Sequence, residues 1–206
     1  MNIIKIMAKG LVKVLPFYLL ALLPLFASCS EDDGTVSEFT DWQQKNESYF
    51  EQQYQAHSIQ SDTKFVVRSW KQPSSKSLKD IAHTDCVLVD VLEKGPADET
   101  ACPLFTDSVQ VHYSGRLIPS PHYSEGYEFD KSYLTTFDAE VDVPSEFLLS
   151  GNIVSGFSTA VQHMHRGDHW RVTVPYQLGY GVSDYNFIPG YSTLIFDIRL
   201  VDFWNP

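Results

Sequence analysis

Long apolar runs are scarce in this chain of 206 residues. The longest, residues 14–26, would reach only ~20 Å as a helix, which is short of the ~30 Å hydrocarbon core of a bilayer. A permanent transmembrane helix is therefore not expected there.

Positive charge is scarce too, with 15 Lys and Arg against 26 Asp and Glu and a net charge of −11. Nucleic-acid binding needs a basic surface, so no nucleic-acid partner is expected.

Sequence signatures of cofactor, metal and nucleophile chemistry are missing as well. The chain has no phosphate-cradling glycine loop and no nucleophile elbow. His163, His165 and His169 stand close together, but two of them flank Met164 near the end of a predicted helix and the third begins a strand. They need not converge, so we expect neither a metal nor a cofactor.

The beginning of the chain has the order of parts found in an export signal. Lys5, Lys9 and Lys13 precede the apolar run, and small residues follow it. Residues 26–29, Phe-Ala-Ser-Cys, resemble the bacterial lipobox, in which the cysteine is lipidated and becomes the first mature residue. We therefore expect a lipoprotein signal peptide at 1–28 and a lipid anchor at Cys29. An ordinary signal with a chance cysteine is the alternative.

The residues after Cys29 are acidic and predict a solvated tether at 29–36. The run Ser-Glu-Asp-Asp resembles the surface-export signal of some Gram-negative lipoproteins. We therefore expect an exported lipoprotein of a Gram-negative-type bacterium, held in the outer membrane on its periplasmic or its outer face. Cleavage would remove three lysines and no acidic residue, which moves the net charge from −11 to −14.

Residues 37–85 are predicted to form an N-terminal extension. Residues 35–38 have the spacing of a capping box, so a helix should begin near Ser37 and run to about Gln55. One face of it carries Phe39, Trp42, Asn46, Tyr49, Phe50 and Gln53 at helical intervals. This stripe should dock on the main domain of the same chain, which we expect to be a monomer; a short dimer seam is the alternative. Residues 65–70 predict a strand and residues 72–80 a loop.

From residue 86 onward the pattern is that of strands and one helix. Alternating apolar residues run through 87–91, 109–113, 170–174 and 194–200. A helix is expected between the second and third of these strands. Gly167 follows it as a stop, and its apolar residues have helical spacing: Phe157, Ala160, Val161 and Met164. We predict an α+β fold in which an antiparallel twisted β-sheet wraps around one short amphipathic helix.

Six segments of this region, in order, resemble the motifs of the FKBP family of peptidyl-prolyl cis-trans isomerases. They are residues 109–115 (VQVHYSG), 127–132 (YEFDKS), 147–157 (FLL and IVSGF), 161–167, 175–181 (PYQLGYG) and 188–197. The resemblance covers about 110 residues and implies an FKBP-like domain at 86–206. It also implies isomerisation of X-Pro bonds in exported or extracellular polypeptides, without a cofactor.

The resemblance assigns a prolyl pocket to this chain, residue by residue. Its catalytic members would be Tyr113, Asp130 and Tyr180, with substrate-binding side chains at Phe129, Phe147, Ile153, Val154, Phe157 and Phe196. Strand alternation independently turns Tyr113 and Phe196 inward. A carboxylate at Asp130, beside so much apolar surface, needs a functional reason.

Two features leave alternatives open. The helix-opening tryptophan of most FKBPs is Phe157 here, and residues 118–126 are longer than the family's usual turn. A non-catalytic FKBP-like module that binds or chaperones polypeptides is therefore the alternative to an isomerase. Cys86 and Cys102 could form a disulfide in an oxidising compartment or remain two free thiols.

Overall fold

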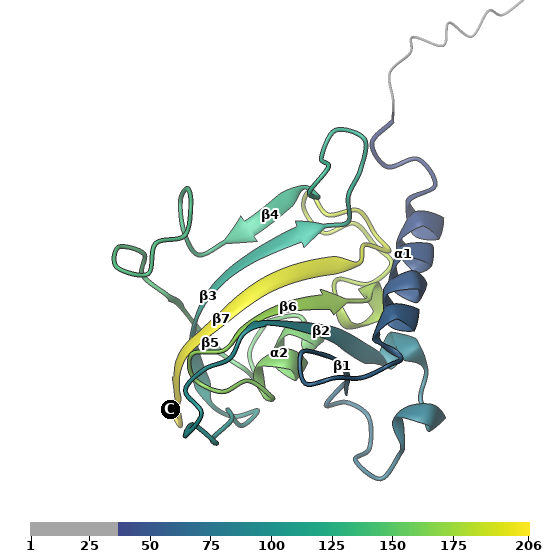
Figure 1. The fold of residues 1–206 in the computed structure, drawn as a ribbon. Helices are drawn as coiled ribbons and strands as arrows, with labels where there is room; N and C mark the ends of the chain where they lie inside the picture. The colour runs from purple at the N-terminus through teal and green to yellow at the C-terminus, as the bar shows by residue number, and fades with distance from the viewer. Residues whose placement is uncertain (1–36) are drawn as a thin grey trace, which may run out of the picture. The chain divides into compact units, whose positions relative to one another are not determined.

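The computed structural model describes residues 37–206, so the predicted signal peptide, tether and Cys29 lie outside the described residues. Seven strands form one antiparallel sheet in the order β1-β2-β6-β7-β3-β4, and β5 pairs with the other half of β3 (Figure 1). Their bounds are β1 Lys64–Arg68, β2 Cys86–Glu93, β3 Ser108–Leu117, β4 Glu128–Lys131, β5 Ser145–Leu148, β6 His169–Val174 and β7 Leu194–Trp204.

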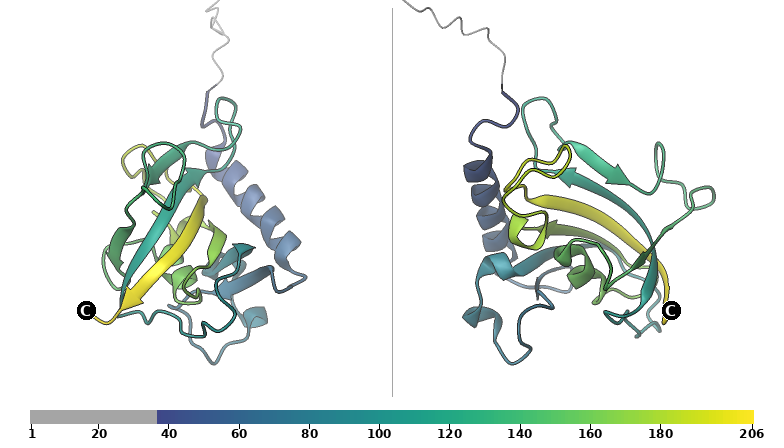
Figure 2. Two further views of the ribbon diagram at one scale, coloured as in Figure 1. Left: turned by 60° about the vertical axis from the view of Figure 1, so that its left-hand side comes forward. Right: turned by 180° about the vertical axis from the view of Figure 1, so that it is seen from behind.

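Two α-helices pack on this sheet. Helix α1, Trp42–His57, runs along one end of the strands, and helix α2, Ser155–Val161, lies against one face (Figures 1 and 2). Short 3₁₀ turns occupy Leu78–Asp80, His83–Asp85 and Tyr176–Leu178. This arrangement confirms the predicted fold class. None of the helices within residues 37–206 is both long enough and apolar enough to cross a membrane.

The main core lies between the sheet and α2. Alternate residues of the central strands point at the helix, and Val87, Val89, Val109, Val172 and Ile198 are fully buried. Helix α2 is buried on nearly every side, because Gly156 lets it approach Val174 so closely that a Cβ at this position would lie 2.2 Å from a Val174 methyl group. The strand phases predicted from the sequence are therefore those of the structure.

Helix α1 docks on the sheet of its own chain through its aromatic stripe. The Trp42 Nε1–H donates to Ser192 Oγ at 2.8 Å, and the Thr193 N–H donates to the Asn46 side-chain oxygen at 2.7 Å. Further along, Phe50 joins Val66 and Leu88 in a second apolar cluster. Apart from Phe39, which stays exposed, the stripe is thus buried or half-buried within one chain.

The helix begins at Trp42 and not near Ser37 as predicted. Asp41 adopts the left-handed conformation, with φ 53°, which interrupts the helix on its N-terminal side. The carboxylate of Glu38, expected in a capping box, instead accepts hydrogen bonds from Ser120 and His122 in the long 118–126 loop. A tertiary contact has replaced the local cap.

Candidate active site

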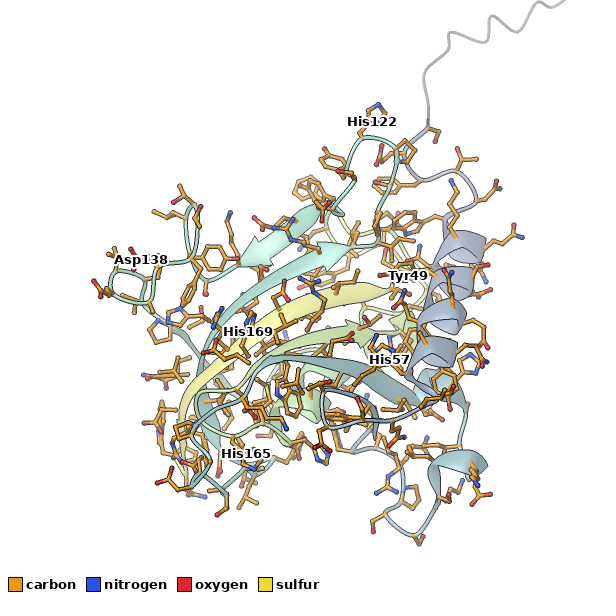
Figure 3. All side chains as sticks on the ribbon, in the orientation of Figure 1. Tyr49, His57, His122, Asp138, His165 and His169 are labelled. Carbon is orange, nitrogen blue, oxygen red and sulfur yellow. The ribbon has the colours of Figure 1, made fainter. Side chains whose placement is uncertain are left out.

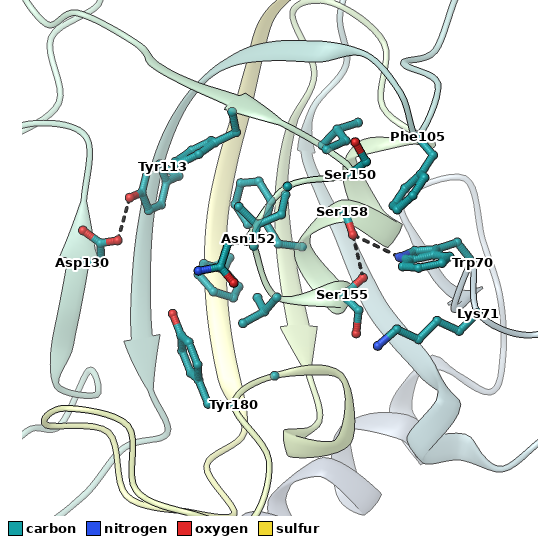
Figure 4. A pocket seen from close by; sticks show the side chains of 18 of the residues that line it. Trp70, Lys71, Phe105, Tyr113, Asp130, Ser150, Asn152, Ser155, Ser158 and Tyr180 are labelled. Carbon is teal, nitrogen blue, oxygen red and sulfur yellow. Dashed lines mark hydrogen bonds between the residues drawn. The ribbon is translucent and has the colours of Figure 1, made fainter.

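A pocket of about 600 Å³ opens above the first turn of α2. Strands β3, β4, β5 and β7, the segment before α2 and the loops after β6 all contribute to it (Figure 4). Eight of the nine site residues predicted from the sequence line it together: Tyr113, Asp130, Phe147, Ile153, Val154, Phe157, Tyr180 and Phe196.

Aromatic rings form the inner wall of the pocket. Three aromatic rings surround that of Phe157 in edge-to-face geometry. Their centroids lie 5.9 Å (Tyr113), 6.0 Å (Phe147) and 5.4 Å (Phe196) from the Phe157 centroid. Phe157 itself is only 4% exposed and closes the base of the pocket. Edge-to-face contacts fix the ring positions, so the apolar surface is preformed.

Phe129 is the one predicted site residue that does not line the pocket. The centroid of its ring lies 5.8 Å from that of Phe196 and 6.5 Å from that of Tyr180. The close packing depends on Gly115, where an added Cβ would lie 2.6 Å from the Phe129 ring and 2.9 Å from Phe196. Phe129 thus packs against two of the rings that line the pocket.

A tyrosine–aspartate pair stands at one end of the mouth. The Tyr113 hydroxyl donates to Asp130 Oδ2 at 2.7 Å (Figure 4), and the pairing of β3 with β4 sets this contact. Burial, and secondarily the neighbouring Asp130, raises the pKa of Tyr113, so its hydroxyl stays a donor at neutral pH. Asp130 itself is exposed at the rim, whereas the sequence suggested a carboxylate set among apolar side chains.

Tyr180 stands across the mouth from this pair. Its ring stacks on Tyr185 at 4.4 Å with an interplanar angle of 7°. Burial raises the pKa of the Tyr180 hydroxyl, with smaller contributions from Tyr185 and Asp130, so it too remains protonated and able to donate. Val154 precedes the first turn of α2, and its N–H has no acceptor within the described residues.

Sequence reasoning missed a group of pocket residues. Trp70 and Lys71 come from the N-terminal extension, Phe105 from the segment before β3, and Tyr185 from the loop after Tyr180. The predicted strand at 65–70 ends at Arg68, and Trp70 then leaves the sheet for the pocket. Periodicity carries no signal for such a departure, because it depends on the tertiary path of the chain.

The remaining candidate residues take no part in the pocket. Cys86 and Cys102 are free thiols, and burial raises the pKa of Cys86 to about 11. His165 and His169 lie apart on the structure (Figure 3). Within residues 37–206 there is no cluster of three metal-ligating side chains.

Comparison with known proteins agrees with this geometry. Residues 102–201 match the model of the family described as FKBP-type peptidyl-prolyl cis-trans isomerase. Over this region the chain is similar to FKBP-type isomerases. The macrophage infectivity potentiator of Trypanosoma cruzi is 37% identical over 100 residues, which are 48% of this chain and 44% of that protein. The FKBP-type 22 kDa peptidyl-prolyl cis-trans isomerase of Escherichia coli (strain K12) is 35% identical over 105 residues, 50% of this chain and 45% of the relative.

The chain thus spans less than half the length of these curated relatives. Among solved structures, FkpA from Escherichia coli superposes with a TM-score of 0.54 at 24% identity, covering 81% of this chain and 63% of FkpA. A peptidyl-prolyl cis-trans isomerase from Pseudomonas syringae superposes with a TM-score of 0.52 at 22% identity, covering 82% and 98%. At these identities the structures establish the FKBP fold, and the extension is part of what superposes.

Proposed function

We propose that this chain is a peptidyl-prolyl cis-trans isomerase that acts on X-Pro bonds of exported polypeptides. The observation that carries the proposal is the preformed aromatic pocket with hydroxyl donors at its mouth. The pocket opens to solvent and can admit a proline ring with the chain on either side. The isomerases among its relatives support the same activity.

The chemistry requires rotation and no covalent step. An uncatalysed X-Pro bond isomerises over a barrier of ~18–20 kcal/mol in tens of seconds or more. The planar imide owes its stability to resonance, and both the resonance and much of the dipole fall as the bond twists. An apolar pocket therefore disfavours the twisted state less than the planar one and lowers the barrier by differential binding.

Each polar group has a role in this scheme. Tyr180 donates a hydrogen bond to a substrate carbonyl, and the free Val154 N–H holds the chain beyond the proline. Asp130, fixed by the Tyr113 hydroxyl, stabilises the polarised imide. Phe147, Ile153, Phe157 and Phe196 enclose the proline ring, and Phe129 holds Phe196 in place.

The cellular setting is proposed from the sequence. Cleavage of the signal at 1–28 would leave the lipidated Cys29 to hold a monomeric protein at the outer membrane of a Gram-negative-type bacterium. The tether at 29–36 would separate the membrane from the extension at 37–85 and the FKBP domain at 86–206. Proline-containing polypeptides outside the cytoplasm would then be the substrates.

One observation favours a second candidate, a non-catalytic module that holds polypeptides. Phe157 gives the pocket a smaller base than the tryptophan of most FKBPs. A measurement of turnover separates the two. Residues 30–206 should accelerate the relaxation of a cis-enriched prolyl tetrapeptide in proportion to protein concentration. Unchanged relaxation together with saturable peptide binding would establish the binding module instead.

A further inference from the structure

The pocket extends well beyond the aromatic rings of its inner wall. At the end opposite Asp130 it is bounded by Trp70, Lys71 and Phe105 (Figure 4). These residues come from two segments that the FKBP motifs do not include: the stretch after β1 and the stretch before β3. A peptide seated against those inner rings would meet these residues as its next contacts on the side of α2.

Trp70 is held firmly against the first turn of α2. Its indole Nε1–H donates to Ser158 Oγ at 3.1 Å, and its backbone N–H donates to Thr159 Oγ1 at 3.4 Å. The hydroxyls of Ser158 and Thr159 in turn donate to the Ser155 carbonyl. The polar edge of the indole is therefore satisfied by the protein, and the exposed part of its apolar ring is available to a ligand.

Trp70 and Phe105 present a preformed apolar wall. Their ring centroids lie 4.3 Å apart with an interplanar angle of 39°. Trp70 nevertheless stays 42% exposed, although Phe157 a short way along the same pocket is almost completely buried. Phe105 is half-buried beside Trp70. A rigid aromatic pair with one exposed ring inside a concave site is typical of a binding contact rather than of core packing.

A positive charge beside this wall restricts the kinds of side chain that can bind there. Lys71 Nζ lies 5.7 Å from the centroid of the Trp70 ring, and Lys71 itself is exposed. A positively charged side chain in this place would be repelled, whereas an aromatic or large aliphatic side chain would bury surface against both rings. The wall therefore fits an apolar side chain and disfavours a cationic one.

We propose that Trp70 and Phe105 form a second subsite that selects prolyl substrates carrying an aromatic or large aliphatic residue a few positions from the proline. The residue lies on the side of the bound chain that the Val154 N–H holds, because Val154 leads directly into the α2 turn on which Trp70 rests. This inference rests on the proposed prolyl site and adds a substrate preference to it. The N-terminal extension thus contributes a specificity determinant to the FKBP domain.

The test compares two pairs of fluorescently labelled prolyl peptides, one pair for each side of the proline. The two peptides of a pair differ only in having Phe or Ser at a position near the proline on that side. Binding to the full-length chain in neutral detergent is followed by anisotropy. On the α2 side, the Phe peptide should bind roughly three- to tenfold tighter than the Ser peptide. Phe105→Ala and Trp70→Ala should each weaken binding of the Phe peptide toward that of the Ser peptide, and so remove most of that preference.

Two further variants separate recognition from mere support of the helix. Trp70→Phe keeps an apolar ring but loses the bond to Ser158, so it should retain most of the preference. Tyr123→Ala removes an equally exposed aromatic residue, 43% exposed, from outside the pocket and should change nothing. If Trp70→Ala does not fold, Phe105→Ala decides, because the Phe105 side chain makes no hydrogen bond to α2.

Equal affinity of the wild type for the Phe and Ser peptides would overturn the subsite, as would a preference that survives both alanine substitutions. Catalysis is measured on the same samples. Normal isomerisation without the preference would refute the subsite alone. A preference that depends on Trp70 and Phe105, in a chain that does not isomerise, would support the subsite and refute only the proposed activity.

Discussion

Single aromatic residues decide how dry and how rigid the pocket is. The ring of Phe196 contacts the rings of both Phe157 and Phe129, so its removal opens the pocket to water. Tyr180 contributes one hydroxyl at the mouth, and its ring would remain in a phenylalanine variant. The two positions therefore allow shape to be compared with hydrogen bonding.

We predict that Phe196→Ala lowers kcat/KM more than Tyr180→Phe does. Loss of one hydrogen bond of ~0.5–1.5 kcal/mol corresponds to at most about tenfold. Asp130→Ala should fall between the two. Steady-state assays of the three variants, with circular dichroism as the check on folding, give the order. A larger defect in Tyr180→Phe than in Phe196→Ala would mean that the hydrogen bond, and not the apolar enclosure, dominates.

The tyrosine hydroxyls also predict the pH dependence. Burial raises the pKa of both Tyr113 and Tyr180 above the ordinary value near 10, so both remain neutral donors throughout the range from pH 6 to 8. Their contribution would decline only in strongly alkaline solution. We expect kcat/KM to vary by less than about twofold between pH 6 and 8. A bell-shaped profile in that range would point to proton transfer and contradict the mechanism.

At this scale the sequence predicted some residues and not others. Tyr113 and Phe196 follow from strand alternation, which needs only local periodicity. The exposure of Asp130 and the arrival of Trp70 and Phe105 could not be predicted in this way, because they depend on which distant segments meet. The resemblance assigns Phe129 to the pocket, but this residue packs against Phe196 and is not among those that line the pocket.

Among the elements, α1 is tied to the sheet by more than its apolar stripe. Asn46 is fully buried, donates to the Trp42 carbonyl and accepts from the Thr193 N–H. At the other end of the helix, the buried His57 Nε2 lies 3.1 Å from Asp90 Oδ2 on β2 (Figure 3). Polar contacts at both ends therefore fix the register of the helix along the sheet.

We predict that Asn46→Ala destabilises the protein, because the buried Thr193 N–H would lose its acceptor. An unsatisfied buried donor costs about 1–3 kcal/mol. Urea denaturation should show the loss in the free energy of unfolding, while Gln44→Ala, on the exposed face of the same helix, should stay within about 0.5 kcal/mol of the wild type. Equal stability of the two variants would contradict a structural role for α1 docking.

The type of each element was easier to predict than its boundaries. Helix α2 and the central strands follow from their apolar periods, and the aromatic stripe of α1 was recognised for the same reason. The predicted start of α1 was wrong, because Glu38 makes a tertiary contact with the 118–126 loop in place of the expected cap. The residues around Glu38 give no indication of that contact, because its partner lies far away in the sequence.

At the scale of the whole molecule, export and anchoring remain predictions from the sequence. In a bacterial host that processes lipoproteins, the wild-type chain should incorporate radiolabelled palmitate and fractionate with membranes. Cys29→Ala should abolish the label, whereas Cys102→Ala, which leaves the lipobox-like run intact, should not. Label that persists in Cys29→Ala would contradict the anchor.

The central claim is that one preformed pocket both holds a prolyl peptide and speeds its isomerisation. Two-dimensional exchange NMR on a prolyl peptide reports both in one sample, through line broadening on binding and through cis–trans exchange peaks. With a catalytic amount of residues 30–206, exchange peaks should appear within a fraction of a second, against tens of seconds or more without protein. Phe196→Ala should remove them. Broadened peptide signals without exchange peaks in the wild type would contradict the account and leave a binding module.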